Sequence, residues 1–201
     1  MGKHRIILIR HAKTPGNKEN RYIGRGSDEP VSDEGVEELK KVDLSLIPYV
    51  DRVFCSPMLR CKTTAEFLFT GRAIETADDM TEMDFGLYEG KNYSNLKDEE
   101  YYQRWIDSGG RIAFPNGEDM QGFVNRSMSA FTRIIKKLHD GESAAIVCHG
   151  GNIMSVMSSL TGTEYFDCNV GNMEGYILDV AYNKDKYDLI SYDRFGAWMA
   201  S

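Results

Sequence analysis

The chain has 201 residues, of which 41% are hydrophobic and 27% charged, the composition of a soluble globular protein with one domain spanning residues 1–201. The formal net charge of −7 argues against a nucleic-acid-binding surface, and no apolar run approaches the roughly 20 residues of a membrane helix. An apolar run that begins almost at the N-terminus leaves no room for a signal peptide, so we expect a cytoplasmic protein. Four cysteines without CxxC spacing fit buried, reduced thiols in that compartment.

The first predicted element is a short strand at residues 6–9, where four consecutive apolar residues indicate burial on both faces. It ends in Arg10 and His11, at the position where open α/β sheets place their ligand crevices. Residues 143–152 (SAAIVCHGGN) repeat this pattern with an apolar run, a histidine and two glycines that open a helix. We interpret His11 and His149 as two halves of one site.

Strands and helices alternate along most of the chain, with the helix over 56–69 predicted to start at a Ser56 cap. Further strands are expected at 51–55, 73–75 and 143–148, helices at 32–41, 56–69, 120–139 and 152–160, and a terminal hairpin at 175–182 and 187–192. This alternation predicts a three-layer α/β/α fold with a mostly parallel central sheet and helices on both faces.

Residues 86–116 differ in character, because aromatic residues stand among charges and glycines with little periodicity. We expect an insertion over the sheet that acts as a lid, with a helix near 96–107. The sequence leaves open whether its aromatic side chains form the core of the lid or grip a substrate that carries a ring.

A parallel sheet brings the carboxyl ends of its strands to one edge, which places Arg10, His11, Arg60 and His149 around one crevice. Arginine forks match phosphate oxygens, and the helix N-terminus at Gly150 suits the same anion. The crevice is therefore predicted to hold a phosphoryl group, which one of the histidines can accept covalently.

Such a transfer needs an acid that protonates the departing alkoxide. Glu82, in the loop after the third strand, is the best-placed candidate, and we expect its neighbours Asp79 and Asp84 to raise its pKa. Asp84 and Glu89 are weaker candidates for the same role.

Taken together, these motifs resemble the histidine phosphatase superfamily, the phosphoglycerate-mutase-like proteins. The family's Arg-His signature is matched at 10–11, its second arginine motif at 56–66, its acid motif at 82–90 and its second histidine motif at 147–151. The segment 115–118 is similar to the Pro-x-Gly-Glu segment of its short phosphatases. The last fifty residues carry no comparable motif.

The resemblance implies a phosphoglycerate-mutase-like fold in which His11 is the phosphorylated nucleophile and Glu82 the proton donor. The catalytic set would also include Arg10, Arg60 and His149, and the substrate-binding set would be Arg10, Thr14, Asn17, Arg60, His149 and Gly150. The resemblance also implies independence from metals and organic cofactors.

Two positions depart from the family pattern beside the nucleophile. Ala12 stands where the family usually has glycine, and a positive φ there would strain an alanine. Lys13 stands where Glu or Gln is common, and we expect it to add positive charge near the mouth of the site.

Three functions fit the sequence. The first is a phosphomonoester hydrolase acting on a small phosphorylated metabolite, like the α-ribazole phosphatase branch or a broad-specificity sugar phosphatase. The second is a phosphoglycerate mutase, which the match at 20–24 favours, and the third is a non-catalytic module that binds phosphorylated ligands. The expected partner is a small-molecule phosphomonoester, with no nucleic acid and no membrane, while a homodimer is left open.

Overall fold

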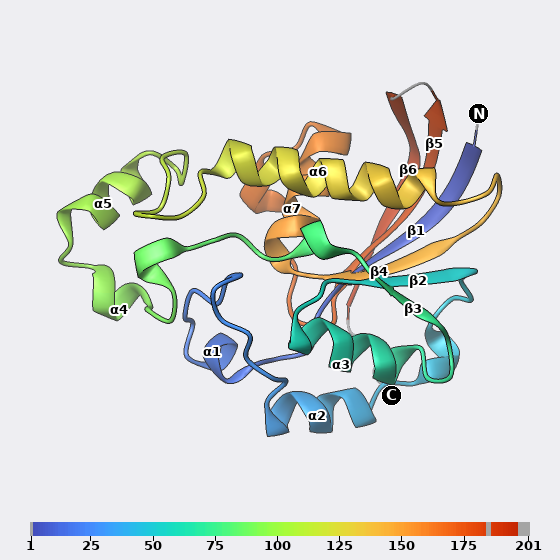
Figure 1. Ribbon diagram of the computed structural model, residues 1–201, viewed down its shortest axis with the longest axis horizontal. Coiled ribbons are helices and arrows are strands. Elements are labelled where there is room, and N and C mark those ends of the chain that lie inside the picture. Colours follow the sequence, from blue (N-terminus) through green and yellow to red (C-terminus); the bar gives the residue numbers. More distant parts are fainter. Residues whose placement is uncertain (1, 184–185, 197–201) are drawn as a thin grey trace.

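A six-stranded sheet in the order β3-β2-β4-β1-β5-β6 forms the centre of the computed structural model, which describes residues 2–183 and 186–196 (Figure 1). The strands are β1 Gly2–Arg10, β2 Arg52–Cys55, β3 Ile74–Thr76, β4 Ala144–Cys148, β5 Gly175–Asn183 and β6 Lys186–Phe195. Strands β3, β2, β4 and β1 are parallel, whereas β5 runs antiparallel to both β1 and β6. The predicted, mostly parallel sheet and its terminal hairpin are confirmed.

Helices cover both faces of this sheet, as a three-layer α/β/α fold requires (Figure 1). The helices are α1 Pro15–Lys18, α2 Asp33–Lys40, α3 Leu59–Leu68, α4 Tyr93–Leu96, α5 Glu100–Asp107, α6 Met120–Lys136 and α7 Gly150–Thr161. Helices α2 and α3 lie on one face, and α6 and α7 on the other. No helix among the described residues is long and apolar enough to span a membrane.

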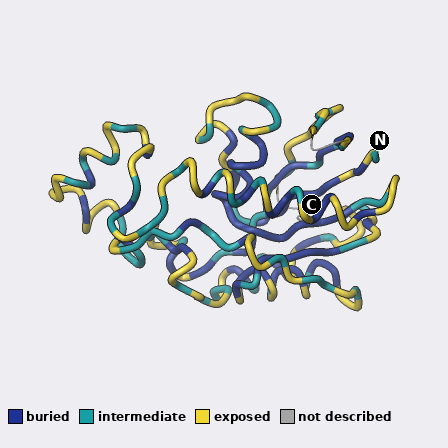
Figure 2. The backbone as a smooth tube through the Cα atoms, turned by 45° about the horizontal axis from the view of Figure 1, so that its top comes forward, coloured by how far each residue is buried: buried dark blue, intermediate teal, exposed yellow. Residues whose placement is uncertain are grey.

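The alternation of side chains along β1 explains the two cores. Ile6 and Leu8 pack with α6 and α7 on one side of the sheet, whereas Ile7 and Ile9 pack with α2 and α3 on the other. All four side chains are completely buried, and the central strands are buried along most of their length (Figure 2). A strand covered on both faces needs this continuous apolar run.

One predicted helix start is wrong. Ser56 does not cap α3, because the helix begins three residues later, at Leu59. The backbone N–H of Leu59 donates instead to the carboxylate of Asp28, at 2.7 Å. The Ser56 hydroxyl lies 2.8 Å from Nε2 of His149, so it contacts the histidine of the second histidine motif.

The 86–116 segment extends beyond the carboxyl edge of the strands and does not cover the face of the sheet (Figure 1). It carries α4 and α5, and its aromatic side chains contribute to a third hydrophobic cluster, separate from the two cores on the sheet. That cluster consists of Met83, Tyr88, Leu96, Tyr102, Phe114 and Phe123. Its position brings the segment next to the edge where the strand-end histidines lie.

Candidate active site

The two histidines of the strand ends meet at the carboxyl edge of the sheet, with their ring centroids 5.2 Å apart. Nδ1 of His11 lies 2.7 Å from the backbone carbonyl oxygen of Ala12. Because a carbonyl oxygen only accepts, Nδ1 carries the proton and Nε2 keeps a free lone pair in the neutral ring. Burial, together with Arg60 and Arg10, holds the pKa of His11 well below its usual range, so the ring stays neutral.

Two arginines adjoin this pair, Arg60 completely buried and Arg10 partly buried. Nη1 of Arg10 donates to the carbonyl oxygen of Val170 at 2.6 Å, and Nη1 of Arg60 donates to that of Ser27 at 2.9 Å. Nε of each guanidinium is buried, and among the described residues neither Nε has a hydrogen-bond partner. A buried donor without a partner costs about 1–3 kcal/mol, so an anion that accepts from both would be bound favourably.

His149 stands immediately before α7 and is completely buried. Burial and the charge of Arg60 hold its pKa well below the usual range. The backbone of Gly150 lies against the guanidinium of Arg10, because a Cβ at this position would be 3.5 Å from Cζ. The first turn of α7 therefore faces the same small space as Arg10.

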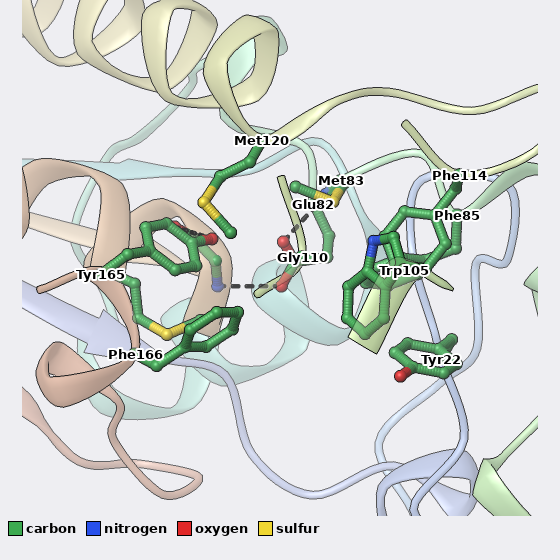
Figure 3. Close-up of a pocket in the computed structure, with 12 residues that line it drawn as sticks. Tyr22, Glu82, Met83, Phe85, Trp105, Gly110, Phe114, Met120, Tyr165 and Phe166 are labelled. Carbon is green, nitrogen blue, oxygen red and sulfur yellow. Dashed lines mark hydrogen bonds between the residues drawn. The ribbon is translucent and has the colours of Figure 1, made fainter. Parts of the chain in front are cut away.

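Glu82 lies across from this turn, where its carboxylate accepts hydrogen bonds from the backbone N–H groups of Met83, at 2.8 Å, and Gly151, at 3.1 Å (Figure 3). Burial raises the pKa of Glu82, although these two donors and the charges of Arg60 and Arg10 oppose the shift. A carboxyl group that keeps its proton more readily than usual suits the role of general acid.

The acidic neighbours of Glu82 do not raise its pKa as expected. Asp79 forms an ion pair with Arg133. Asp84 accepts from the backbone N–H of Gly86 at 2.9 Å. The other weaker acid candidate, Glu89, accepts from the backbone N–H of Gly24 at 2.9 Å. These contacts hold loops in place, whereas Glu82 interacts electrostatically with Arg60 and Arg10.

Thr14 and Asn17 form a reciprocal capping pair at α1. The Thr14 hydroxyl accepts from the backbone N–H of Asn17, and Oδ1 of Asn17 accepts from that of Thr14. Thr14 is fully buried, so it acts on the site through Asn17, which lines a polar cavity together with Arg10.

Sequence reasoning missed Asn172, which lines the same cavity. Its side-chain amide donates to Oδ1 of Asn17 at 3.1 Å and to the carbonyl oxygen of His11 at 2.9 Å. Asn172 belongs to the last fifty residues, where no motif pointed to it, and it lies just before β5, which pairs antiparallel with β1.

Both departures from the family pattern have a structural explanation. Ala12 is not among the described non-glycine residues with positive φ, and its N–H donates to Oγ1 of Thr64 at 2.9 Å. The expected extra charge of Lys13 is wrong, because Nζ pairs with Glu34 at 2.7 Å and Glu38 at 2.8 Å. Lys13 thus tethers α2, and its charge is balanced there.

The sequence model of the histidine phosphatase superfamily (branch 1) matches residues 6–192. The chain is 25% identical over 165 residues to phosphoserine phosphatase 1 of Hydrogenobacter thermophilus, covering 80% of this chain and 77% of the relative. It is 28% identical over 162 residues to the adenosylcobalamin/alpha-ribazole phosphatase of Salmonella typhimurium, covering 78% and 79%.

A solved structure, the alpha-ribazole phosphatase from Shigella flexneri, aligns with a TM-score of 0.77 at 26% identity, covering 92% of this chain and 94% of that one. The chain therefore belongs to the histidine phosphatase superfamily, branch 1. Within that class it is an enzyme with phosphatase function.

Proposed function

We propose that this enzyme hydrolyses phosphomonoesters of small metabolites through a phosphohistidine on His11, with neither a metal nor an organic cofactor. The observation that carries the proposal is the hydrogen bond from Nδ1 of His11 to the carbonyl oxygen of Ala12, because it leaves Nε2 as the free nucleophile. The unpartnered Nε atoms of Arg10 and Arg60 supply donors for the phosphoryl oxygens.

In the first step, Nε2 of His11 attacks phosphorus while the ester P–O bond breaks. The bonding electron pair leaves with the alcohol oxygen, which takes the proton of Glu82. Arg10, Arg60 and His149 stabilise the charge of the phosphoryl group as it passes from the ester oxygen to Nε2 of His11.

In the second step, water attacks the phosphohistidine. Glu82, now a carboxylate, accepts a proton from the water, the oxygen bonds to phosphorus, and the N–P bond breaks with its electron pair returning to Nε2. Inorganic phosphate leaves with one oxygen from water, and both His11 and Glu82 regain their starting protonation states.

Hydrolysis is favoured over mutase chemistry by the polar cavity beside Arg10. It has a volume of about 420 Å³ and is lined by Asn17 and Asn172 among others. A polar space of this size holds water, whereas a mutase must keep its phosphohistidine from water until the group returns to a bound acceptor.

The deciding assay compares phosphate release from several phosphomonoesters with phosphoglycerate isomerisation by the same preparation. We expect net phosphate release and weak or no isomerisation. Isomerisation much faster than phosphate release would identify a mutase, and ligand binding without either reaction would identify a binding module.

A further inference from the structure

A second, apolar cavity of about 160 Å³ lies against the carboxyl group of Glu82. Trp105 and Phe114 of the 86–116 segment form one side, and Tyr165 and Phe166, from the short helical turn after α7, form the other (Figure 3). Glu82 stands between these two walls and is the one charged residue among the described residues that line the cavity.

The two tyrosine hydroxyl groups of the cavity wall are engaged by protein groups, whereas Nε1 of Trp105 is buried without a hydrogen-bond partner among the described residues. The hydroxyl of Tyr165 donates to the carbonyl oxygen of Gly151 at 3.3 Å, and the hydroxyl of Tyr22 lies 2.8 Å from that of Tyr102. Apart from the carboxyl group of Glu82 and the indole N–H of Trp105, the wall therefore presents rings and thioethers to a ligand. Because no lysine, arginine or histidine is among the described lining residues, a carboxylate bound here would lose its water without gaining a counter-ion.

The cavity adjoins the phosphoryl site through two consecutive residues. Gly150 lies against the guanidinium of Arg10, and the N–H of Gly151 donates to Glu82. An alcohol that leaves a phosphoryl group held by Arg10 and takes the proton of Glu82 must lie on the Glu82 side. That side is the apolar cavity.

We propose that the substrate's alcohol carries an uncharged, apolar group about the size of one six-membered ring, which fills this cavity. The proposal rests on the proposed function, since it assigns the cavity to the leaving alcohol. The volume sets the size, because an apolar cavity of about 150 Å³ in a protein core binds benzene. Phosphoserine and phosphoglycerate carry a carboxylate near the phosphate, which would lie against this apolar wall, so we do not expect them to be the substrate.

The first test uses phosphate esters of primary alcohols, so that the leaving groups differ mainly in what the cavity must hold. We expect kcat/KM for benzyl phosphate to exceed that for methyl phosphate by about 10–100-fold, the effect of burying an aromatic ring. The value for 4-carboxybenzyl phosphate should be about tenfold or more below that for benzyl phosphate. Equal values for benzyl phosphate and either of the other esters would overturn the proposal.

The second test changes the size of the cavity. Met120 lines it from α6, whereas Met128 on the same helix packs against the core of the sheet, so Met120→Ala and Met128→Ala form a matched pair. We expect Met120→Ala to raise the ratio of naphthylmethyl to benzyl phosphate hydrolysis about tenfold, and Met128→Ala to leave it unchanged. If Met120→Ala does not fold, Phe166→Ala replaces it, because Phe166 is 53% exposed. An unchanged ratio in the folded cavity variant contradicts the assignment.

A binding measurement separates this proposal from the proposed function. Calorimetry with benzylphosphonate and methylphosphonate, which cannot be hydrolysed, should show about tenfold tighter binding of the benzyl compound in the intact protein. Tighter binding without hydrolysis of any ester would refute the catalytic proposal and keep the cavity assignment. Hydrolysis through phosphohistidine with equal binding of both phosphonates would support the catalytic proposal and refute the cavity assignment.

Discussion

The hydroxyl of Ser56 lies 2.8 Å from Nε2 of His149, and both residues are completely buried. The same hydroxyl oxygen accepts from the backbone N–H of Met58 at 3.4 Å, so the loop before α3 fixes its position. Ser56 thereby holds the imidazole of His149 beside His11 without bordering the phosphoryl site itself. We regard it as a positioning residue.

Replacing Ser56 should therefore weaken catalysis through His149. We expect Ser56→Ala to lower kcat/KM about 2–15-fold, the effect of one lost hydrogen bond, with most of the loss in kcat. Ser56→Thr keeps a hydroxyl and should recover most of the activity. Wild-type kinetics in Ser56→Ala would show that the ring is held by other contacts.

Glu82→Gln should affect poor leaving groups most, because a missing proton donor matters least when the alcohol is already acidic. We expect hydrolysis of alkyl phosphates to fall by roughly 10²–10⁴-fold and that of nitrophenyl phosphate far less. Asp84→Asn is the control, because the carboxylate of Asp84 accepts a hydrogen bond from the backbone N–H of Gly86 in a loop. Equal losses of Glu82→Gln on both substrates would indicate a binding role.

His11 and His149 should make the folded protein sensitive to acid. Their pKa values lie well below the usual 6.5, so below about pH 6.5 the unfolded chain binds protons that the folded chain does not. Stability is complete above that pH and falls as pH is lowered, by about 1.4 kcal/mol per pH unit for each histidine. In denaturant titrations at several pH values, His11→Asn should reduce this dependence of the unfolding free energy on pH by about 1.4 kcal/mol per pH unit, the contribution of one proton.

His139 provides the matched control for that experiment, because it is exposed and lies outside the site. His139→Asn removes one histidine outside the site, and the two variants are compared with the wild type at each pH. A slope that is equally steep in His11→Asn would mean that the folded protein protonates His11 as readily as the unfolded chain does.

Activity should survive exhaustive chelation. Arg10, Arg60 and the N-terminus of α7 supply the positive electrostatic environment that metal ions supply in many phosphatases. Phosphate release should therefore be the same before and after dialysis against EDTA. A complete loss that added divalent ions restore would mean that the site requires a metal.

The sequence allowed the sheet and the histidine pair to be predicted because both follow from local patterns. A continuous apolar run must be buried on both faces, and parallel strands place their carboxyl ends together, so Arg10, His11 and His149 converge once the strands are assigned. The cap of α3 could not be predicted in this way. Asp28 and Leu59 meet across a loop, and nothing local distinguishes Asp28 from Ser56 as the capping side chain.

Contacts with distant segments also explain why the role of the Lys13 charge was predicted wrongly. Lys13 looked free in the sequence because its partners, Glu34 and Glu38, come from a helix twenty residues later. Asn172 and the cavity residues Tyr165 and Phe166 carry no motif, and they reach the site through the packing of the C-terminal segment. Contacts between distant segments decide these roles.

A rapid-quench labelling experiment shows directly whether His11 carries the phosphoryl group. The enzyme is mixed with a substrate labelled in its phosphoryl group, quenched in base within the first turnover, digested and mapped. We expect a label that is stable in base, labile in acid and located on His11. A label found on His149 alone, or on a serine or aspartate, would contradict it.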